Sequence, residues 1–211
     1  MTFKDKIFSW FVKNIIMSKM EEISNSGFII TRVSPLGDVY LRDLFIPENL
    51  LVLVENSCRI CSDNKFINLL YLTGKKFVFN YSKLSNFPTS KEKNFSMFAN
   101  FFVKYIEGTY AKKITHEIDI KNKFLKLNCD NYIVCSKNGL GYIFSCGSIA
   151  GVWSYAFQDL NIEAVQPKCQ GRGDKECLVI AAPYETLVKM GYKPIRCEEI
   201  EKNHKENNIN G

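Results

Sequence analysis

The sequence predicts an α+β fold, in which N-terminal helices pack on an antiparallel sheet. Three observations favour it. Apolar residues recur at helical spacing up to about residue 110, and from residue 114 they alternate with polar residues, as in strands with one buried face. One helix backed by glycines then interrupts the strands, before a C-terminal hairpin flanked by cysteines. Helices grouped ahead of strands favour α+β over a doubly wound parallel sheet.

Length and composition indicate one domain with a large core. The chain has 211 residues, of which 46% are hydrophobic, and its 16 Phe and 10 Tyr are more than a disordered chain would carry. The most apolar early stretch, residues 7–20, is interrupted by Lys13, Asn14 and Lys19, so we expect no membrane span. Eight cysteines in a chain of this length are typical of reduced thiols, which predicts a cytoplasmic protein.

The net charge of +6 comes from the middle of the chain, where residues 65–126 contain twelve lysines and four acidic residues. These lysines occur mostly as singles and pairs, and no arginine accompanies them to fork onto phosphates. We therefore interpret them as a solvated surface and expect no nucleic-acid partner.

Residues 1–60 are predicted to form a helix-and-strand extension that packs on the same core. Residues 3–23 have helical spacing and a broad apolar face, which suits core packing or a homodimer contact. A short strand is expected at 27–30. Pro47 followed by Glu48 favours a helix that runs to about residue 58.

The main domain is predicted over residues 61–183 and opens with two helices. The first covers 65–84. The second follows Thr89 and Glu92, which have the spacing of a capping box, and Gly108 is placed to end it.

Strands follow these helices. Alternation over residues 114–120 places His116 on the apolar face, where a histidine is more often a core residue than a catalyst. Further strands are expected at 124–129, 132–135, 142–145, 162–169 and 177–182. The remaining residues, 184–211, are predicted to be a polar and partly disordered C-terminal extension.

The helix inserted among these strands has its apolar residues on a single stripe. That stripe consists of Ile149, Val152, Trp153, Ala156, Phe157 and Leu160. Gly147 and Gly151 lie four residues apart, so the helix backbone could approach a sheet or another helix closely.

The last two strands flank a glycine-containing loop with a cysteine at each end. If the strands pair, the thiols of Cys169 and Cys177 lie close enough to share a metal or to form a disulfide. A structural zinc needs four ligands, and Cys146 is the best third ligand by position. The further candidates are Glu163, Cys129 and Cys135. The alternative is that both cysteines are small buried residues.

The pattern Gly147-x3-Gly151-x17-Cys169-x3-Gly173-Asp174-x2-Cys177 resembles the C-terminal signature of the vinyl-4-reductase domain family. Leu69-Leu70-Tyr71-Leu72-Thr73-Gly74 is similar to that family's opening helix, and the likeness covers roughly residues 60–183. The resemblance implies a fold shared with subunits of the TRAPP vesicle-tethering complex, a pocket for a hydrophobic small molecule, and often a homodimer. In aromatic-sensing bacterial activators, the cysteines that match Cys169 and Cys177 help to bind a structural zinc, which is the cofactor that the resemblance implies.

The predicted function is therefore the binding of a hydrophobic or planar small molecule in an apolar pocket, as in a sensor. The residues expected to line the pocket are Phe95, Phe98, Phe102, Trp153 and Phe157. Two alternatives stay open: an interaction or scaffold subunit that forms TRAPP-like dimers, and a tetrapyrrole vinyl reductase whose bound cofactor performs the chemistry. No catalytic residue is expected, because the chain has two histidines and no nucleophile elbow or Walker loop.

Overall fold

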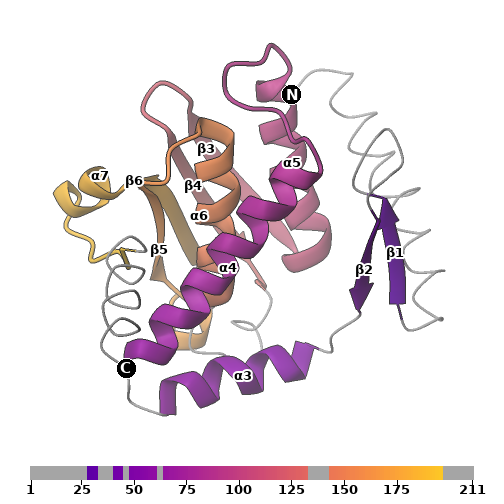
Figure 1. The fold of residues 1–211 in the computed structure, drawn as a ribbon. Helices are drawn as coiled ribbons and strands as arrows, with labels where there is room; N and C mark the ends of the chain where they lie inside the picture. Colours follow the sequence, from indigo (N-terminus) through magenta and orange to yellow (C-terminus); the bar gives the residue numbers. More distant parts are fainter. Residues whose placement is uncertain (1–27, 33–39, 45–47, 61–63, 133–142, 197–211) are drawn as a thin grey trace, which may run out of the picture.

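The computed structural model describes residues 28–32, 40–44, 48–60, 64–132 and 143–196 (Figure 1). Within these ranges the predicted α+β class is confirmed, since the helices α3, α4 and α5 precede a four-stranded antiparallel sheet. The predicted helix at 3–23 lies outside the described residues, as do most of the expected strand at 132–135 and the end of the C-terminal extension.

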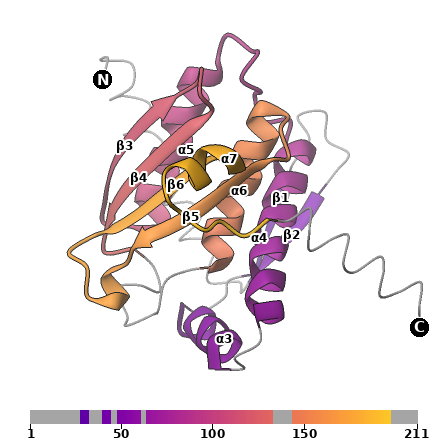
Figure 2. The same cartoon turned by 90° about the vertical axis from the view of Figure 1, so that its left-hand side faces the viewer.

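The sheet has the strand order β3-β4-β6-β5, and every neighbouring pair is antiparallel. Its strands are β3 (Lys113–Asp119), β4 (Phe124–Asp130), β5 (Ile162–Lys168) and β6 (Cys177–Pro183). Alternate residues of β6 face opposite sides. Val179 and Ala181 belong to the main core, whereas Ile180 and Ala182 pack with Leu187 of α7 (Tyr184–Lys189). Helix α7 therefore covers the face of the sheet away from α4 and α6 (Figures 1 and 2).

Helix α6 (Ile143–Phe157) lies between α4 (Asn64–Leu84) and the sheet (Figure 1). Ten of its fifteen residues are buried, so its buried surface is much wider than the predicted single stripe. Leu160, assigned to that stripe, follows the end of the helix and is exposed.

Glycines allow the backbones of α4 and α6 to touch. A Cβ atom on Gly147 would lie 2.0 Å from the carbonyl oxygen of Tyr71, and one on Gly151 would lie 2.3 Å from that of Lys75. From the other helix, a Cβ atom on Gly74 would lie 2.2 Å from the oxygen of Phe144. The predicted close approach is confirmed, and the partner is a helix.

The expected strand at 142–145 is wrong, because α6 begins at Ile143. The Glu55 carboxylate of α3 (Glu48–Ile60) accepts hydrogen bonds from the backbone N–H groups of Ile143 (3.2 Å) and Phe144 (2.9 Å). Glu55 is only 1% exposed. An acidic side chain at this position satisfies amides that a helix start leaves without partners and also favours the helix dipole. This capping group is 88 residues away in sequence, so the local pattern does not reveal it.

The predicted boundaries of α5 (Phe95–Tyr110) are also wrong, by about one turn at the start and less at the end. The Thr89 N–H does donate to Glu92 Oε1 (2.8 Å), but this pair closes a turn before the helix. Gly108 lies inside the last turn. There the Glu107 carboxylate accepts the Ile114 N–H (2.8 Å) and ties the end of α5 to β3.

His116 lies on the predicted face of β3, opposite the buried Leu127, but its own side chain is not buried as predicted. Strand β3 is an edge of the sheet, and of its seven residues only Ile114 is fully buried. The His116 side chain is exposed, and its Nε2 lies 3.1 Å from Asn100 Oδ1. Partial burial and the positive charge of Lys104 lower the pKa of His116, so the ring is neutral at physiological pH.

A strand and a helix were not expected from the sequence, and neither was the short 3-10 helix at Gln170–Arg172 in the hairpin loop. Strand β2 (Tyr40–Leu44) pairs with β1 (Phe28–Arg32) in a separate two-stranded antiparallel sheet. Helix α7 lies at the start of the predicted polar extension, and its Leu187 is fully buried. None of the described helices combines the length and the hydropathy that crossing a bilayer requires.

Candidate functional site

The predicted cysteine-flanked hairpin is present. Lys168 pairs with Leu178, so the next step of the register places Cys169 opposite Cys177, and both side chains are fully buried. The backbone N–H of Gln170 lies 3.4 Å from Cys177 Sγ. The Asp174 carboxylate accepts the Cys169 N–H (2.7 Å), which closes the loop. Asp174 therefore has a structural role.

The candidate zinc ligands do not form a complete site in the described part of the chain. Cys129 pairs with Cys177 across β4 and β6, but Cys146 is in the first turn of α6, and Glu163 bonds to Tyr71 and Lys75. Among the described residues, no group of three or more His, Cys, Asp or Glu side chains could hold a metal. Those residues alone do not fit a structural zinc, which needs four ligands. Cys135 lies outside the described ranges, and zinc stays a prediction.

Cys129 is expected to resist alkylation while the protein is folded. Burial, followed by the neighbouring Cys177 thiol, raises the pKa of Cys129 from 9.0 to about 12, so almost no thiolate exists at pH 8. Mass spectrometry after iodoacetamide treatment at pH 8 should find Cys129 modified in urea but not in buffer.

The raised pKa of Cys129 also means that, as the pH rises, its thiol ionises in the unfolded protein before it does in the folded protein. The free energy of unfolding should therefore fall with pH above about 9 in the native protein, and less in Cys129→Ala. Rapid alkylation of Cys129 in the folded protein would contradict the raised pKa on which both predictions depend.

A buried ion pair links α4 to β5. Lys75 Nζ lies 2.8 Å from Glu163 Oε1, and the two side chains are 6% and 2% exposed. Lys75 also donates to the Leu160 carbonyl (2.9 Å), and the Tyr71 hydroxyl donates to Glu163 Oε2 (2.9 Å). The Ala164 N–H donates to the same hydroxyl (2.7 Å). Each charge thus has a partner, as burial requires.

The five aromatic residues predicted to line a pocket form one cluster between α5 and α6. Ring centroids are 5.6 Å apart for Phe95 and Phe157, 5.3 Å for Trp153 and Phe157, and 6.4 Å for Phe98 and Phe102. Phe95 and Trp153 are nearly fully buried. The rings pack on one another, and neither of the two hollows described below is lined by any of them. Their role in ligand binding stays a prediction.

A groove of about 280 Å³ lies beside the edge strand β5. It is bounded by the start of α6, by β5, by the hairpin loop, and by the segment that follows α7, which crosses beside β5 toward α4 (Figure 2). Its lining residues are Tyr71, Ile143, Cys146, Ala164, Val165, Gln166, Pro167, Arg172, Tyr192, Lys193 and Ile195. Most of them are apolar, and a few polar groups are placed among them, as in small-molecule sites.

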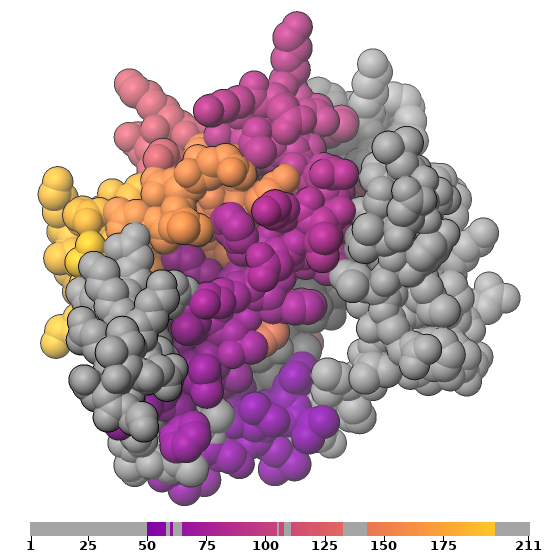
Figure 3. Space-filling view, viewed as in Figure 1, coloured from indigo at the N-terminus to yellow at the C-terminus, as the bar shows by residue number. Residues whose placement is uncertain are grey.

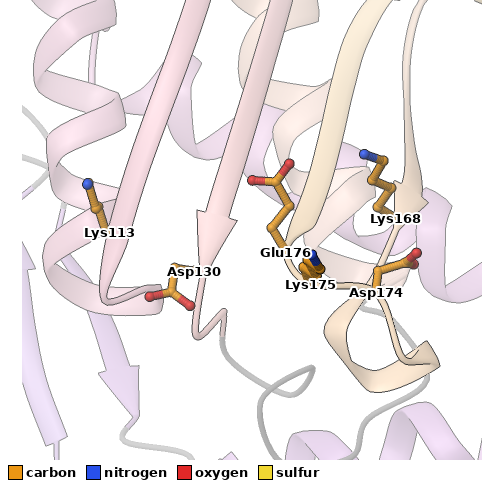
Figure 4. A pocket seen from close by; sticks show the side chains of 6 residues that line it. All are labelled: Lys113, Asp130, Lys168, Asp174, Lys175 and Glu176. Atoms are coloured by element: carbon orange, nitrogen blue, oxygen red, sulfur yellow. The ribbon is translucent and has the colours of Figure 1, made fainter.

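A larger hollow, of about 630 Å³, lies at the end of the sheet near the hairpin loop. It is lined by Lys113, Asp130, Lys168, Asp174, Lys175 and Glu176. Figure 4 shows these side chains spread along the strand ends instead of converging on one point. Three lysines and three carboxylates cancel in charge, and no apolar side chain is among them, so this hollow does not suit an apolar ligand.

Sequence reasoning missed the groove and the ion pair. Tyr71, Gly74 and Lys75 recur at i, i+3 and i+4 on α4, which places them on one helix face. The sequence signal for the ion pair was therefore Lys75 next to Gly74 on this helix face. No pattern in the sequence indicated that Tyr192 and Ile195 line the groove. They reach it only because α7 and the following segment pass around the edge of the sheet.

Comparison with known proteins gives fold relatives only. No family model matches the sequence, and no curated protein matches it significantly. The phenol-responsive sensory domain of the transcription activator PoxR matches with a TM-score of 0.54 and 13% identity, over 82% of this chain and 92% of that domain. Trafficking protein particle complex subunit 3 from Naegleria fowleri, covalently bound to palmitic acid, gives 0.45 and 14%, over 64% of this chain and 94% of that subunit. At these identities the likeness is one of architecture, and the chain has the fold of the PoxR sensory domain.

Proposed function

We propose that this protein is a small-molecule-binding domain of the vinyl-4-reductase type, which holds a small apolar molecule in the groove beside β5. The groove is the observation that carries the proposal, because it combines an apolar lining with a few fixed polar groups. The fold likeness to a phenol-responsive sensory domain supports the same class of function. A cytoplasmic location remains part of the proposal.

The floor of the groove is preorganised. The Tyr71 hydroxyl is fixed by Glu163 and by Ala164, so the ring cannot swing when a ligand arrives. Ile195 packs against the main core and Tyr192 against the cluster under α7, which holds the opposite wall. A site whose walls are already ordered loses less entropy on binding.

The test is ligand binding by groove-filling variants. Native mass spectrometry should find a small apolar molecule on the purified protein, and NMR titration with phenol should move the amide signals of Ala164, Val165, Tyr192 and Ile195. Ile195→Trp fills the groove and should weaken phenol binding about tenfold or more, since a blocked pocket loses most of its contacts. Val188→Trp, which introduces the same side chain at an exposed site on α7, should have no effect.

Phe102→Leu decides between the groove and the aromatic cluster. Binding that survives this change favours the groove, whereas binding lost through Phe102→Leu and kept in Ile195→Trp would move the site to the cluster of Phe95, Phe98, Phe102, Trp153 and Phe157. A protein that is ligand-free under varied expression conditions and does not respond to phenol would contradict the proposed function.

A second candidate is an interaction subunit that forms homodimers. Four large apolar side chains of α3 are exposed: Leu50, Leu53, Val54 and Ile60. The first three share one helix face, opposite the Glu55 contact with α6. Helix α3 lies at the lower edge of the molecule in Figure 3. Light scattering on the same purified protein measures its oligomeric state, and a monomer at high concentration would weigh against this candidate.

A further inference from the structure

We propose that the ligand of the groove carries an anionic head, of the carboxylate kind, that binds between Arg172 and Lys193. This inference rests on the proposed function and specifies the class of molecule bound. The two cations are the charged side chains among the described residues that line the groove, and no carboxylate lines it. The larger hollow, with its balanced charges, offers no such preference.

Arg172 is held in place by the hairpin loop. Its Nη2 donates to the Gln166 carbonyl (2.7 Å), and its backbone N–H donates to the Cys169 carbonyl (2.9 Å). A guanidinium has five N–H donors, so one bond to Gln166 fixes the group without exhausting it. Asp174, two residues on, turns its carboxylate to the Cys169 amide. The loop therefore presents a positioned cation at the rim of the groove.

The charge beneath the floor does not oppose an anion. Glu163 lies behind Tyr71, but Lys75 Nζ is 2.8 Å from its carboxylate, and the two charges cancel. Among the described residues that line the groove, Arg172 and Lys193 therefore carry the net charge. A cationic rim over an apolar lining is complementary to a molecule with one negative end and a hydrophobic body.

A groove beside an edge strand could also bind an extended peptide that adds a strand to the sheet. The edge formed by β5 is unsuited to such pairing. The β5–β6 register shifts between Val165 and Lys168, and Pro167 has no N–H to donate. The Gln166 carbonyl is already taken by Arg172. Main-chain pairing along this part of β5 is thus blocked. A volume of about 280 Å³ suits a single ring or a short acyl chain.

The experiment compares benzoate with benzyl alcohol, which share a ring and differ in charge, by NMR titration of the full chain at pH 7. Benzoate should bind about tenfold tighter, because charge-assisted hydrogen bonds are roughly twice as strong as neutral ones. Arg172→Gln and Lys193→Gln should each remove most of that advantage, measured as the ratio of the benzoate and benzyl alcohol affinities of the same variant. Lys189→Gln, an equal change of charge on α7 outside the groove, should alter neither.

The outcomes separate the two proposals. If benzyl alcohol binds in the groove and benzoate binds no tighter, or if both rim variants retain full benzoate affinity, the anionic head is wrong and the small-molecule function stands. If neither compound shifts the amides around β5, the proposed function fails as well. Arg172 and Lys193 are exposed in the structure, so either variant should fold, and circular dichroism verifies this before the titration.

Discussion

Gly147→Ala is expected to lower the free energy of unfolding by about 2 kcal/mol or more, although alanine is the better helix former. The added Cβ would lie 2.0 Å from the Tyr71 carbonyl oxygen and 3.0 Å from the Lys75 nitrogen, both of which are backbone atoms of α4. Backbone cannot rotate out of the way as a side chain can. Helix α6 would have to move away from α4, and it is packed against the sheet on its other side.

The sign of the effect is diagnostic. At an uncrowded helix position, glycine to alanine stabilises by about 1 kcal/mol. Urea unfolding followed by circular dichroism measures the change, and Ser148→Ala, the next residue on the same helix and only half-buried, serves as the control with little expected loss. An unchanged or higher stability of Gly147→Ala would mean that the two helices are farther apart than described.

Lys75→Met is expected to destabilise the fold by about 3–5 kcal/mol, the range for removal of one partner of a buried ion pair. Glu163 would keep the Tyr71 hydroxyl but lose its counter-ion while only 1% exposed. The Leu160 carbonyl would lose its ammonium donor as well. Most of the loss comes from the uncompensated charge rather than from the strength of the pair itself.

The double variant Lys75→Met with Glu163→Leu separates the cost of the uncompensated charge from the strength of the pair, because it removes both charges and keeps apolar volume. It should recover much of the stability lost in the single variant. Lys123→Met breaks the pair between Lys123 and Asp159, whose side chains are 38% and 24% exposed, and should cost about 1 kcal/mol or less. Equal losses of the free energy of unfolding, measured in urea, for Lys75→Met and Lys123→Met would contradict the claim that burial makes the loss of Lys75 more costly.

Local patterns in the sequence were enough to predict the elements that depend on neighbouring residues. Alternation located β3, turn chemistry with flanking cysteines located the β5–β6 hairpin, and glycine spacing located the close face of α6. The errors occur where a distant group decides. The start of α6 depends on Glu55 of α3, and the exposure of His116 depends on β3 being an edge strand.

The candidate site was less predictable than the fold. The sequence correctly placed Cys169 and Cys177 at the ends of one loop, but the residues that bound the groove come from α4, α6, β5, the hairpin loop and the segment after α7. Their meeting point depends on strand order, which places β5 at the edge, and a single sequence does not encode strand order locally. Lys193 lies in the segment predicted to be a polar extension, so the sequence did not single it out.

The Glu55 contact bears on where the smallest independently folding fragment begins. A polypeptide that started at residue 61, the first residue of the predicted main domain, would retain the sheet and α6 but lack the acceptor for the amides of Ile143 and Phe144. The first amides of α6 would then have to bond to water, or the first turn of the helix would fray, next to the floor of the groove. Residues 48–60 are accordingly an integral part of the folding unit, not an appendage to it.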